Sequence, residues 1–349
     1  ALHMSLLLAG VKKDDEVLTQ ALTFIATCNA LSYIGAHPVF LDVDKSTMGL
    51  SPDAMKEWLQ ANAEIRKNTR IAELPESQDF AFREDELACY NKHTGCRIKA
   101  CVPMHTFGHA VRIEEIVALC KEWHIELVED AAESIGSTYK GQHTGTFGRI
   151  GAISFNGNKM ITTSGGGALL CHTEEEARRV KFYATQAREP FPWYQHEQIG
   201  YNYRLSNVSA GIGRGQMRVV DNHIARRRSI HRLYTELLAG LPGITVVEPK
   251  KSTMFLPNYW LTTIKVDSNE TGFSALQLMQ HLAKADIETR PLWKPLHLQP
   301  VFSSSPSYVN GISEALFNCG LCLPSGPMVT DGDVMRVADA IRSMIESIK

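Results

Sequence analysis

The sequence has no excess of charge of one sign and no long hydrophobic run. It contains 36 lysines and arginines against 38 aspartates and glutamates, which gives a formal net charge of -2 at pH 7. A balanced charge without a block of like charges does not indicate nucleic acid or an anionic membrane surface as a partner. No apolar run approaches the roughly 20 residues that a membrane-spanning helix needs. We therefore expect a protein that binds neither nucleic acid nor a membrane.

The sequence also lacks the cysteine pattern of a metal site. Most of its eight cysteines lie in apolar segments, as buried thiols do in a reducing cytosol. Cys319 and Cys322 have the spacing of half a zinc site, but no second pair of cysteines or histidines has a matching spacing. We therefore expect a cytoplasmic protein without a bound metal.

Length and composition are those of an ordinary globular chain. Its 349 residues are more than one hydrophobic core usually holds, so two domains are the first expectation. Hydrophobic residues make up 44% and charged residues 21% of the chain, which are common values. The first ten residues are apolar but lack the basic front and the cleavage signal of a signal peptide. We expect a buried helix there.

Strand and helix patterns alternate in the first half of the chain. Short β-rich runs predict strands at residues 16–18, 38–41, 100–102, 126–128 and 152–155. Apolar residues recur at helical spacing between Ile113 and Trp123. This alternation indicates an α/β fold with a mostly parallel sheet that helices cover on both faces. Ligands in such sheets bind beyond the carboxyl ends of the strands.

The remaining segments predict a second, smaller unit. The polar segment 61–98 predicts a surface excursion, and residues 206–241 predict a long helical stretch whose basic run at 226–228 faces solvent. Further on, the patterns predict strands at 244–247 and 260–264 and helices at 274–284 and 331–348. We expect three parts: a large domain over 1–205, a linking helix over 206–241 and a small C-terminal domain over 242–349.

Asp130 stands just after the strand predicted at residues 126–128. A buried, unpaired aspartate is costly, so an aspartate at this place needs a cationic partner. A protonated pyridine nitrogen is one such partner, and holding that proton makes the pyridine ring an electron sink. Alternatively, Asp130 caps a helix that follows it. The residues alone favour neither interpretation.

Lys159 follows the strand predicted at 152–155 and has small and amide neighbours without charge. A lysine in such surroundings can lose its proton and form a Schiff base. Ser154, five residues earlier, could donate a hydrogen bond to a phosphate, and the glycines at 165–167 allow a tight reversal of the chain. A lone lysine in a loop is usually a solvated charge, so the spacing alone is a weak signal.

Taken together, these motifs resemble the sugar-nucleotide aminotransferases of the DegT/StrS type, which are pyridoxal-phosphate (PLP) enzymes of fold type I. The first motif runs from Glu129 to Ser134, and the second joins Ser154, Phe155 and Lys159 to the glycine run. Further matching segments lie at 19–29, 35–44, 102–109, 200–207 and 290–297. The resemblance implies a large α/β domain, with a mostly parallel sheet covered by helices, and a smaller C-terminal α+β domain.

The resemblance also implies roles for single residues around PLP. Lys159 would hold the cofactor as a Schiff base and move a proton between the substrate and the cofactor. Asp130 would pair with the pyridine nitrogen, and Glu133 would lie near the phenolic oxygen. Ser154 would bind the phosphate. Phe24 would stack on the ring, although an ordinary core aromatic would look the same in the sequence.

Two further implications concern the assembly. Asn202 would reach the phosphate from the neighbouring subunit, so the active sites would be shared within an obligate homodimer. In the family, a short turn that holds the phosphate on backbone N–H groups directly precedes the helix that matches Ala1-Leu2-His3. The chain starts just after that turn, so we expect the N-terminal part of the large domain to be missing.

Within the family, the motifs most resemble enzymes acting on UDP-linked 4-keto-6-deoxy-N-acetylhexosamines, which supply bacterial surface glycans. L-glutamate would be the amino donor. Lys294 and His297 would meet the diphosphate and the sugar hydroxyls, and Tyr194, His196 and Trp293 would line the pocket. Each of these five residues could equally be a surface or packing residue.

Two other functions fit parts of the pattern. A PLP-dependent sugar dehydratase shares the scaffold, but such enzymes commonly replace the Schiff-base lysine with histidine, and Lys159 argues against this interpretation. A PLP-binding regulatory protein without activity would keep the cofactor motifs. No feature of the sequence favours that second alternative.

Overall fold

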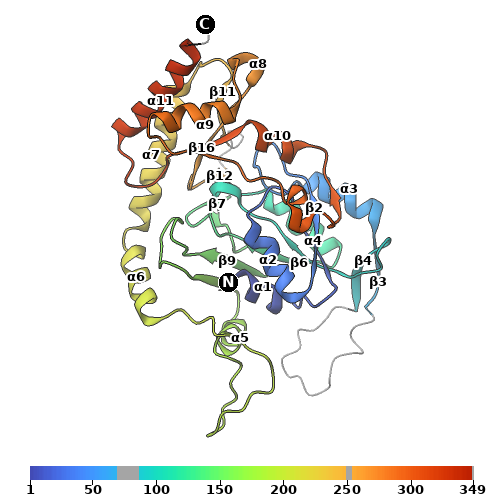
Figure 1. Ribbon diagram of the computed structural model, residues 1–349. Coiled ribbons are helices and arrows are strands. Elements are labelled where there is room, and N and C mark those ends of the chain that lie inside the picture. The colour runs from blue at the N-terminus through green and yellow to red at the C-terminus, as the bar shows by residue number, and fades with distance from the viewer. Residues whose placement is uncertain (69–85, 249–253, 348–349) are drawn as a thin grey trace.

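The computed structural model describes residues 1–68, 86–248 and 254–347 (Figure 1). Its largest sheet has seven strands in the order β10–β9–β6–β5–β1–β2–β15. These strands are β1 (Glu16–Gln20), β2 (His37–Leu41), β5 (Ile98–Val102), β6 (Glu126–Asp130), β9 (Ile150–Ser154), β10 (Gly167–Cys171) and β15 (Ser307–Tyr308). Except for β10, which is antiparallel to β9, all neighbours are parallel. The predicted sheet is confirmed.

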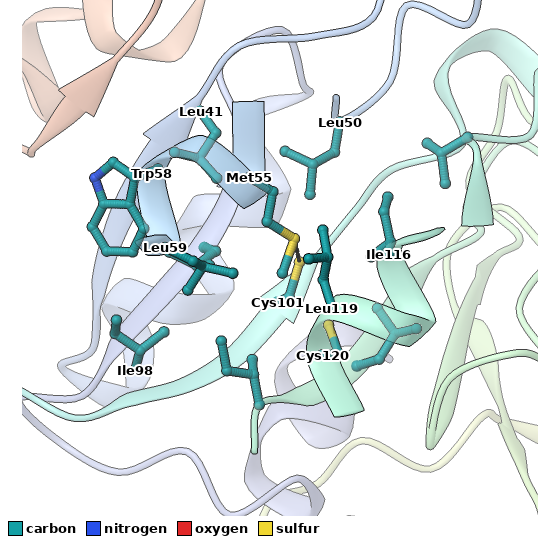
Figure 2. Close-up of a cluster of buried hydrophobic side chains, with 14 of the residues drawn as sticks. Leu41, Leu50, Met55, Trp58, Leu59, Ile98, Cys101, Ile116, Leu119 and Cys120 are labelled. Atoms are coloured by element: carbon teal, nitrogen blue, oxygen red, sulfur yellow. Dashed lines mark hydrogen bonds between the residues drawn. The ribbon is translucent and has the colours of Figure 1, made fainter. Parts of the chain in front are cut away.

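Helices cover both faces of this sheet because successive strand residues point to opposite sides. The helices are α1 (Leu2–Leu8), α2 (Ile25–Ile34), α3 (Pro52–Asn62), α4 (Ile113–Glu122) and α5 (Glu174–Ala184). Val17 belongs to the apolar layer that includes residues of α1 and α2, whereas Leu18 belongs to the layer of α3 and α4. Figure 2 shows this second layer, where Met55 and Leu119 lie beside Cys101 of β5.

The segment predicted as a surface excursion contains an antiparallel pair of strands. These are β3 (Ala63–Lys67), most of which is exposed, and β4 (Leu87–Asn91). Residues 69–85 of the predicted excursion lie outside the described residues. A separate small sheet joins β7 (Thr138–Tyr139) to β8 (Gln142–His143) and β12 (Phe255–Leu256).

The long helical stretch consists of α6 (Asn207–Met217) and α7 (Val220–Leu238). The prediction that its basic run faces solvent is wrong. Arg227 is only 4% exposed, and its guanidinium donates hydrogen bonds to the carbonyl oxygens of Trp260 and Ser325. Burial lowers the pKa of Arg227 to about 10. Backbone carbonyls replace water around this cation, and the sequence of one helix does not reveal such distant partners.

The C-terminal part of the chain forms a second sheet in the order β11–β13–β16–β14, with all neighbours antiparallel. Its strands are β11 (Ile244–Val246), β13 (Thr262–Val266), β14 (Arg290–Pro291) and β16 (Gly320–Leu323). Together with α7, the helices α9 (Ala275–Lys284) and α11 (Asp331–Glu346) share an apolar core with this sheet. Residue 348, the predicted end of the last helix, lies outside the described residues.

Shorter elements complete the fold. They are η2 (Thr106–Gly108), α8 (Ser268–Thr271), η3 (Leu296–Leu298), η4 (Pro300–Phe302) and α10 (Ile312–Cys319). Through β12 and β15, the C-terminal part also adds strands to sheets of the first part. The domain boundaries at residues 205 and 241 stay a prediction. In the described ranges, no helix combines the length and the apolar character needed to cross a membrane.

Candidate active site

The predicted cofactor residues gather at the carboxyl ends of the central strands. Asp130 is the last residue of β6 and Ser154 the last of β9, while Phe24 precedes the first turn of α2. With Lys159, they line one cavity of about 690 Å³. Met104, which follows β5, lines it too. This edge of the sheet is where ligands bind in parallel α/β folds.

Asp130 is buried, with 5% of its surface exposed. Its carboxylate accepts hydrogen bonds from the hydroxyl of Thr27 at 2.8 Å and from the backbone N–H of Ala132 at 3.2 Å. It forms no ion pair with any of the residues that the structure describes. Residues 131–137 form turns rather than a helix, so Asp130 does not cap a helix. A buried carboxylate with neutral donors suits a protonated ring nitrogen as its cationic partner.

Thr27, which holds Asp130 in place, was not among the predicted site residues. Thr27 also lies 3.0 Å from the hydroxyl of Thr23, which in turn reaches the sulfur of Met104 at 3.0 Å. These side chains join the strand ends of β1, β5 and β6. The signal was available in part, because Thr27 lies three residues after Phe24 in a segment that matches the family. Nothing in that spacing, however, reveals the contact with Asp130.

Lys159 forms an ion pair with Glu133, whose carboxylate is buried. The ammonium nitrogen of Lys159 lies 2.9 Å from Oε1 of Glu133, and the backbone N–H of Phe107 donates to Oε2 at 2.9 Å. Burial raises the pKa of Glu133 to about 7, although the Lys159 charge opposes this shift. The structure thus places a carboxylate of high proton affinity against the predicted Schiff-base lysine.

Trp260 is a second residue that sequence analysis missed. The ammonium of Lys159 lies 4.3 Å from the centre of the Trp260 ring and 5.9 Å from that of Phe24. The indole N–H of Trp260 donates to the carbonyl of Asn158 at 2.9 Å, next to Lys159 in the chain. Aromatic faces attract a cation by their quadrupole. Because Trp260 comes from a distant segment, no local pattern connects it with Lys159.

The glycine run permits close packing beside Ser154. Gly167 pairs with Ser154 across β9 and β10, and a Cβ atom on Gly167 would lie 2.4 Å from the carbonyl oxygen of Ile153. Gly166 has a φ of 116°, which side chains strongly disfavour. The hydroxyl of Ser154 accepts a hydrogen bond from the backbone N–H of Asn156 at 3.3 Å. Its own proton is therefore free to reach a ligand in the cavity.

Asn202, Tyr194 and His196 lie away from Lys159 within this chain. Asn202 lines a second cavity of about 540 Å³, together with Arg188 and other residues. Tyr194 is 79% exposed, and the guanidinium of Arg188 lies 4.1 Å from the centre of its ring. His196 is exposed and its Nδ1 lies 2.9 Å from the carbonyl oxygen of Gln186. One chain alone does not bring these three residues to the cavity of Lys159.

The residues predicted around 293–297 differ in their surroundings. Trp293 lies beside the site, with its ring 5.9 Å from that of Phe24 and 4.6 Å from that of Phe107. Lys294 is exposed. His297 lies 3.0 Å from Glu314 through its Nε2 atom. Thus Trp293 packs against Phe24 at the edge of the cavity, and Lys294 and His297 lie on the segment that continues from it.

The described side chains fit PLP. A lysine, a buried carboxylate without an ion pair, a serine hydroxyl and an aromatic face share one cavity. Lys159 would hold the aldehyde carbon and Asp130 the ring nitrogen. This set defines a PLP-dependent enzyme of the α/β type, since a lysine that can bind the aldehyde and a carboxylate that can hold the ring nitrogen protonated are what such chemistry requires.

Comparison with known proteins also indicates a PLP-dependent enzyme. The profile of the DegT/DnrJ/EryC1/StrS aminotransferase family matches residues 1–342, and the chain belongs to this family. It is 38% identical to the "putative pyridoxal phosphate-dependent aminotransferase EpsN" of Bacillus subtilis (strain 168), covering 100% of this chain and 82% of that protein. It is 33% identical to the "GDP-perosamine synthase" of Escherichia coli O157:H7, covering 98% of this chain and 82% of that protein.

A solved structure supports the same conclusion. The aminotransferase TlmJ from Streptoalloteichus hindustanus superposes with a TM-score of 0.82 at 25% identity, over 100% of this chain and 84% of that one. The chain is therefore a PLP-dependent aminotransferase of the sugar-nucleotide family, as its motifs predict.

Proposed function

We propose that the enzyme transfers the amino group of L-glutamate to C4 of a nucleotide-linked 4-keto-6-deoxy sugar. The observation that carries the proposal is the cavity shared by Lys159 and the buried Asp130. The name of the E. coli relative, GDP-perosamine synthase, supports a nucleotide sugar as the amino acceptor. Such products would serve the synthesis of bacterial surface polysaccharides or glycans.

Each cofactor-binding residue then has a role that its surroundings support. PLP, when bound, draws electrons from the reacting carbon into its ring. Asp130 holds the proton on the ring nitrogen, and Thr27 keeps the carboxylate of Asp130 in place. Ser154 binds the phosphate, and Phe24 covers one face of the ring. Lys159 moves a proton to and from the reacting carbon as a general acid–base.

For the acceptor, we propose a UDP-linked N-acetylhexosamine derivative, with the GDP-linked sugar as the second candidate. The first choice rests on the motifs at 102–109 and 290–297, and the second on the name of the E. coli relative. Trp293, which lies beside Phe24, lines the sugar subsite. Lys294 and His297 meet the diphosphate and the hydroxyls, and Tyr194 and His196 come from the exposed segment before Asn202.

We also propose a cytoplasmic homodimer with shared active sites. None of the residues of α5 and α6 is buried in the single chain, and α6 exposes Val208, Ile212 and Met217. Exposed apolar residues on one helix favour a protein partner. A second copy placed there would let Asn202 of one chain serve the phosphate at Lys159 of the other. The eight thiols, none of them in a disulfide, suit a reducing compartment.

The proposal is tested by an amino-transfer assay with L-glutamate and a panel of nucleotide-linked 4-keto sugars. The panel varies the nucleotide between UDP and GDP and the C2 substituent between acetamido and hydroxyl. An aminated sugar, found by mass spectrometry, is the expected product. A deoxygenated sugar would instead identify a dehydratase, and bound PLP without turnover on any sugar would favour a regulatory protein.

A further inference from the structure

Glu133 and Lys159 form a closely confined pair. The side chain of Glu133 is 0% exposed and that of Lys159 is 10% exposed. Because Oε2 of Glu133 accepts the backbone N–H of Phe107, Oε1 points to the nitrogen of Lys159 at 2.9 Å. Phe107 itself has a positive φ of 54°, so the turn that presents this N–H is held in an unusual conformation. The geometry therefore fixes which oxygen meets the lysine.

When Lys159 binds a carbonyl compound, a proton of its ammonium group must move to another group. An ammonium group has no free electron pair, so its nitrogen must lose a proton before it can attack the carbonyl carbon. In the described part of the chain, the hydrogen bond from the nitrogen of Lys159 goes to Glu133. The aromatic rings of Trp260 and Phe24, whose centres lie 4.3 Å and 5.9 Å from this nitrogen, accept no proton.

The charges around Glu133 favour its protonated form once Lys159 becomes neutral. Among the described residues, the ionisable groups that interact with Glu133 include the Lys159 ammonium, the Asp130 carboxylate and the thiol of Cys322. Burial and Asp130 raise the pKa of Glu133, and Lys159 holds it down to about 7. When the positive charge of Lys159 disappears, this opposing effect disappears as well. The pKa of Glu133 must then rise further.

We propose that Glu133 takes the proton that Lys159 gives up and keeps it for as long as the site holds the cofactor. The N–H bond of the ammonium breaks and an O–H bond forms at Oε1 of Glu133. The neutral amine then forms the C=N bond to the cofactor aldehyde, and its two remaining protons leave with the aldehyde oxygen as water. When water reverses this step and the cofactor leaves, the carboxyl returns the proton; a lysine that the amino substrate displaces stays a neutral amine and can accept a proton. The inference rests on the proposed function, because it requires Lys159 to be the residue that binds PLP.

The experiment counts protons while the cofactor-free full-length protein is loaded with PLP. Calorimetric titrations in two buffers with different ionisation enthalpies, at about pH 8, give the net number of protons exchanged with solvent. In the wild type, the proton of Lys159 stays on Glu133. In Glu133→Gln it must leave the protein, so this variant should release about one more proton per site than the wild type.

Two variants serve as controls. Glu114→Gln also removes a carboxylate that pairs with a lysine, Lys140 at 2.6 Å, but this pair is on the surface; it should exchange as many protons as the wild type. Glu133→Asp retains a carboxyl group and should also match the wild type. Should Glu133→Gln fail to fold or to bind PLP, infrared difference spectra of the wild type are expected to gain a protonated-carboxyl band on loading. If no such band appears, the inference is overturned.

Equal proton counts in the wild type and in loaded Glu133→Gln would overturn the inference and leave the proposed function intact. The proposed function fails separately if borohydride reduction of the loaded wild type, followed by peptide mapping, finds no PLP mass on Lys159.

Discussion

The hydroxyl of Thr27 donates a hydrogen bond of 2.8 Å to the carboxylate of Asp130. The two residues come from α2 and the end of β6, and both line the cavity that contains Lys159. Since the carboxylate also accepts the N–H of Ala132, its orientation is fixed on both oxygens. A carboxylate fixed before the ligand arrives loses no rotational freedom on binding, which is the condition for strong electrostatic support.

Replacement of Thr27 by valine should slow the reaction without unfolding the protein. The valine keeps the volume and removes the hydrogen bond to a charged group, which contributes about 1.5–3 kcal/mol. If only part of this free energy no longer stabilises the transition state, kcat/KM falls roughly ten-fold. Ser32→Ala is the control, because Ser32 lies on the same helix and its hydroxyl bonds only to the backbone carbonyl of Cys28 in the described structure. Equal kcat/KM values for both variants would contradict the role of Thr27.

Asp130→Asn should have a larger effect. The amide keeps the shape of the side chain but no longer holds the ring nitrogen in its protonated form. Loss of one well-placed charge-stabilising group typically lowers kcat by about 100-fold or more. PLP should still bind, because Lys159 and Ser154 are unchanged, and its absorbance measures the occupancy of the site. A normal kcat at full occupancy would show that Asp130 has a structural role.

Mixed dimers test whether Asn202 serves the partner's site. Lys159→Ala removes the amine from one chain, and Asn202→Asp in another chain sets a carboxylate against the phosphate, a like-charge clash. Each homodimer should be nearly inactive. In a mixed dimer, one shared site has both changes and the other has neither. Random pairing therefore restores roughly a quarter of wild-type activity. If mixing restores nothing, Lys159 and Asn202 do not form a composite site between chains.

A buried pair of histidines, His109 and His231, should make the protein sensitive to acid. Burial lowers the pKa of His109 to about 4 and that of His231 to about 3. None of their ring nitrogens has a hydrogen-bond partner among the described residues, and the His231 ring stacks on Tyr259 at 3.6 Å. Nε2 of His231 does lie 3.6 Å from a carboxylate oxygen of Glu248, but this distance is too long for a hydrogen bond.

The direction in which the free energy of unfolding changes with pH follows from proton binding. Between about pH 6.5 and pH 4, histidines of the unfolded chain bind protons, whereas the two buried histidines of the folded chain do not. The free energy of unfolding therefore falls as the pH falls. Between pH 7 and pH 5 the loss should be on the order of 1–2 kcal/mol per histidine. Urea titrations at both values measure it. His231→Phe, which keeps the stacked ring, should lose less stability over this interval; an unchanged pH dependence would contradict the assignment.

The sequence predicted the elements whose signals are local. The strands β1, β2, β5, β6 and β9 each have an apolar run of their own. Asp130 and Ser154 are the last residues of two of them, and Lys159 follows Ser154 by five residues. Contacts between distant segments could not be predicted in this way. Trp260 reaches Lys159 across about a hundred residues, and Arg227 is buried because two distant carbonyl groups accept its hydrogen bonds. Glu133 was predicted as a neighbour of the cofactor, but its ion pair with Lys159 depends on the turn at Phe107.

The central claim is that the site at Lys159 carries an amino group from a donor to a nucleotide sugar. A single-turnover experiment tests it most directly. The protein is loaded with PLP, converted with L-glutamate that contains heavy nitrogen, and freed of excess donor. The nucleotide-linked 4-keto sugar is then added, and the product is analysed by mass spectrometry. The account predicts about one labelled amino-sugar per site for the wild type, as expected for a two-step transfer, and none for Lys159→Ala. It is contradicted if the wild type releases 2-oxoglutarate but transfers no label to any sugar of the panel, or if Lys159→Ala transfers as much label as the wild type.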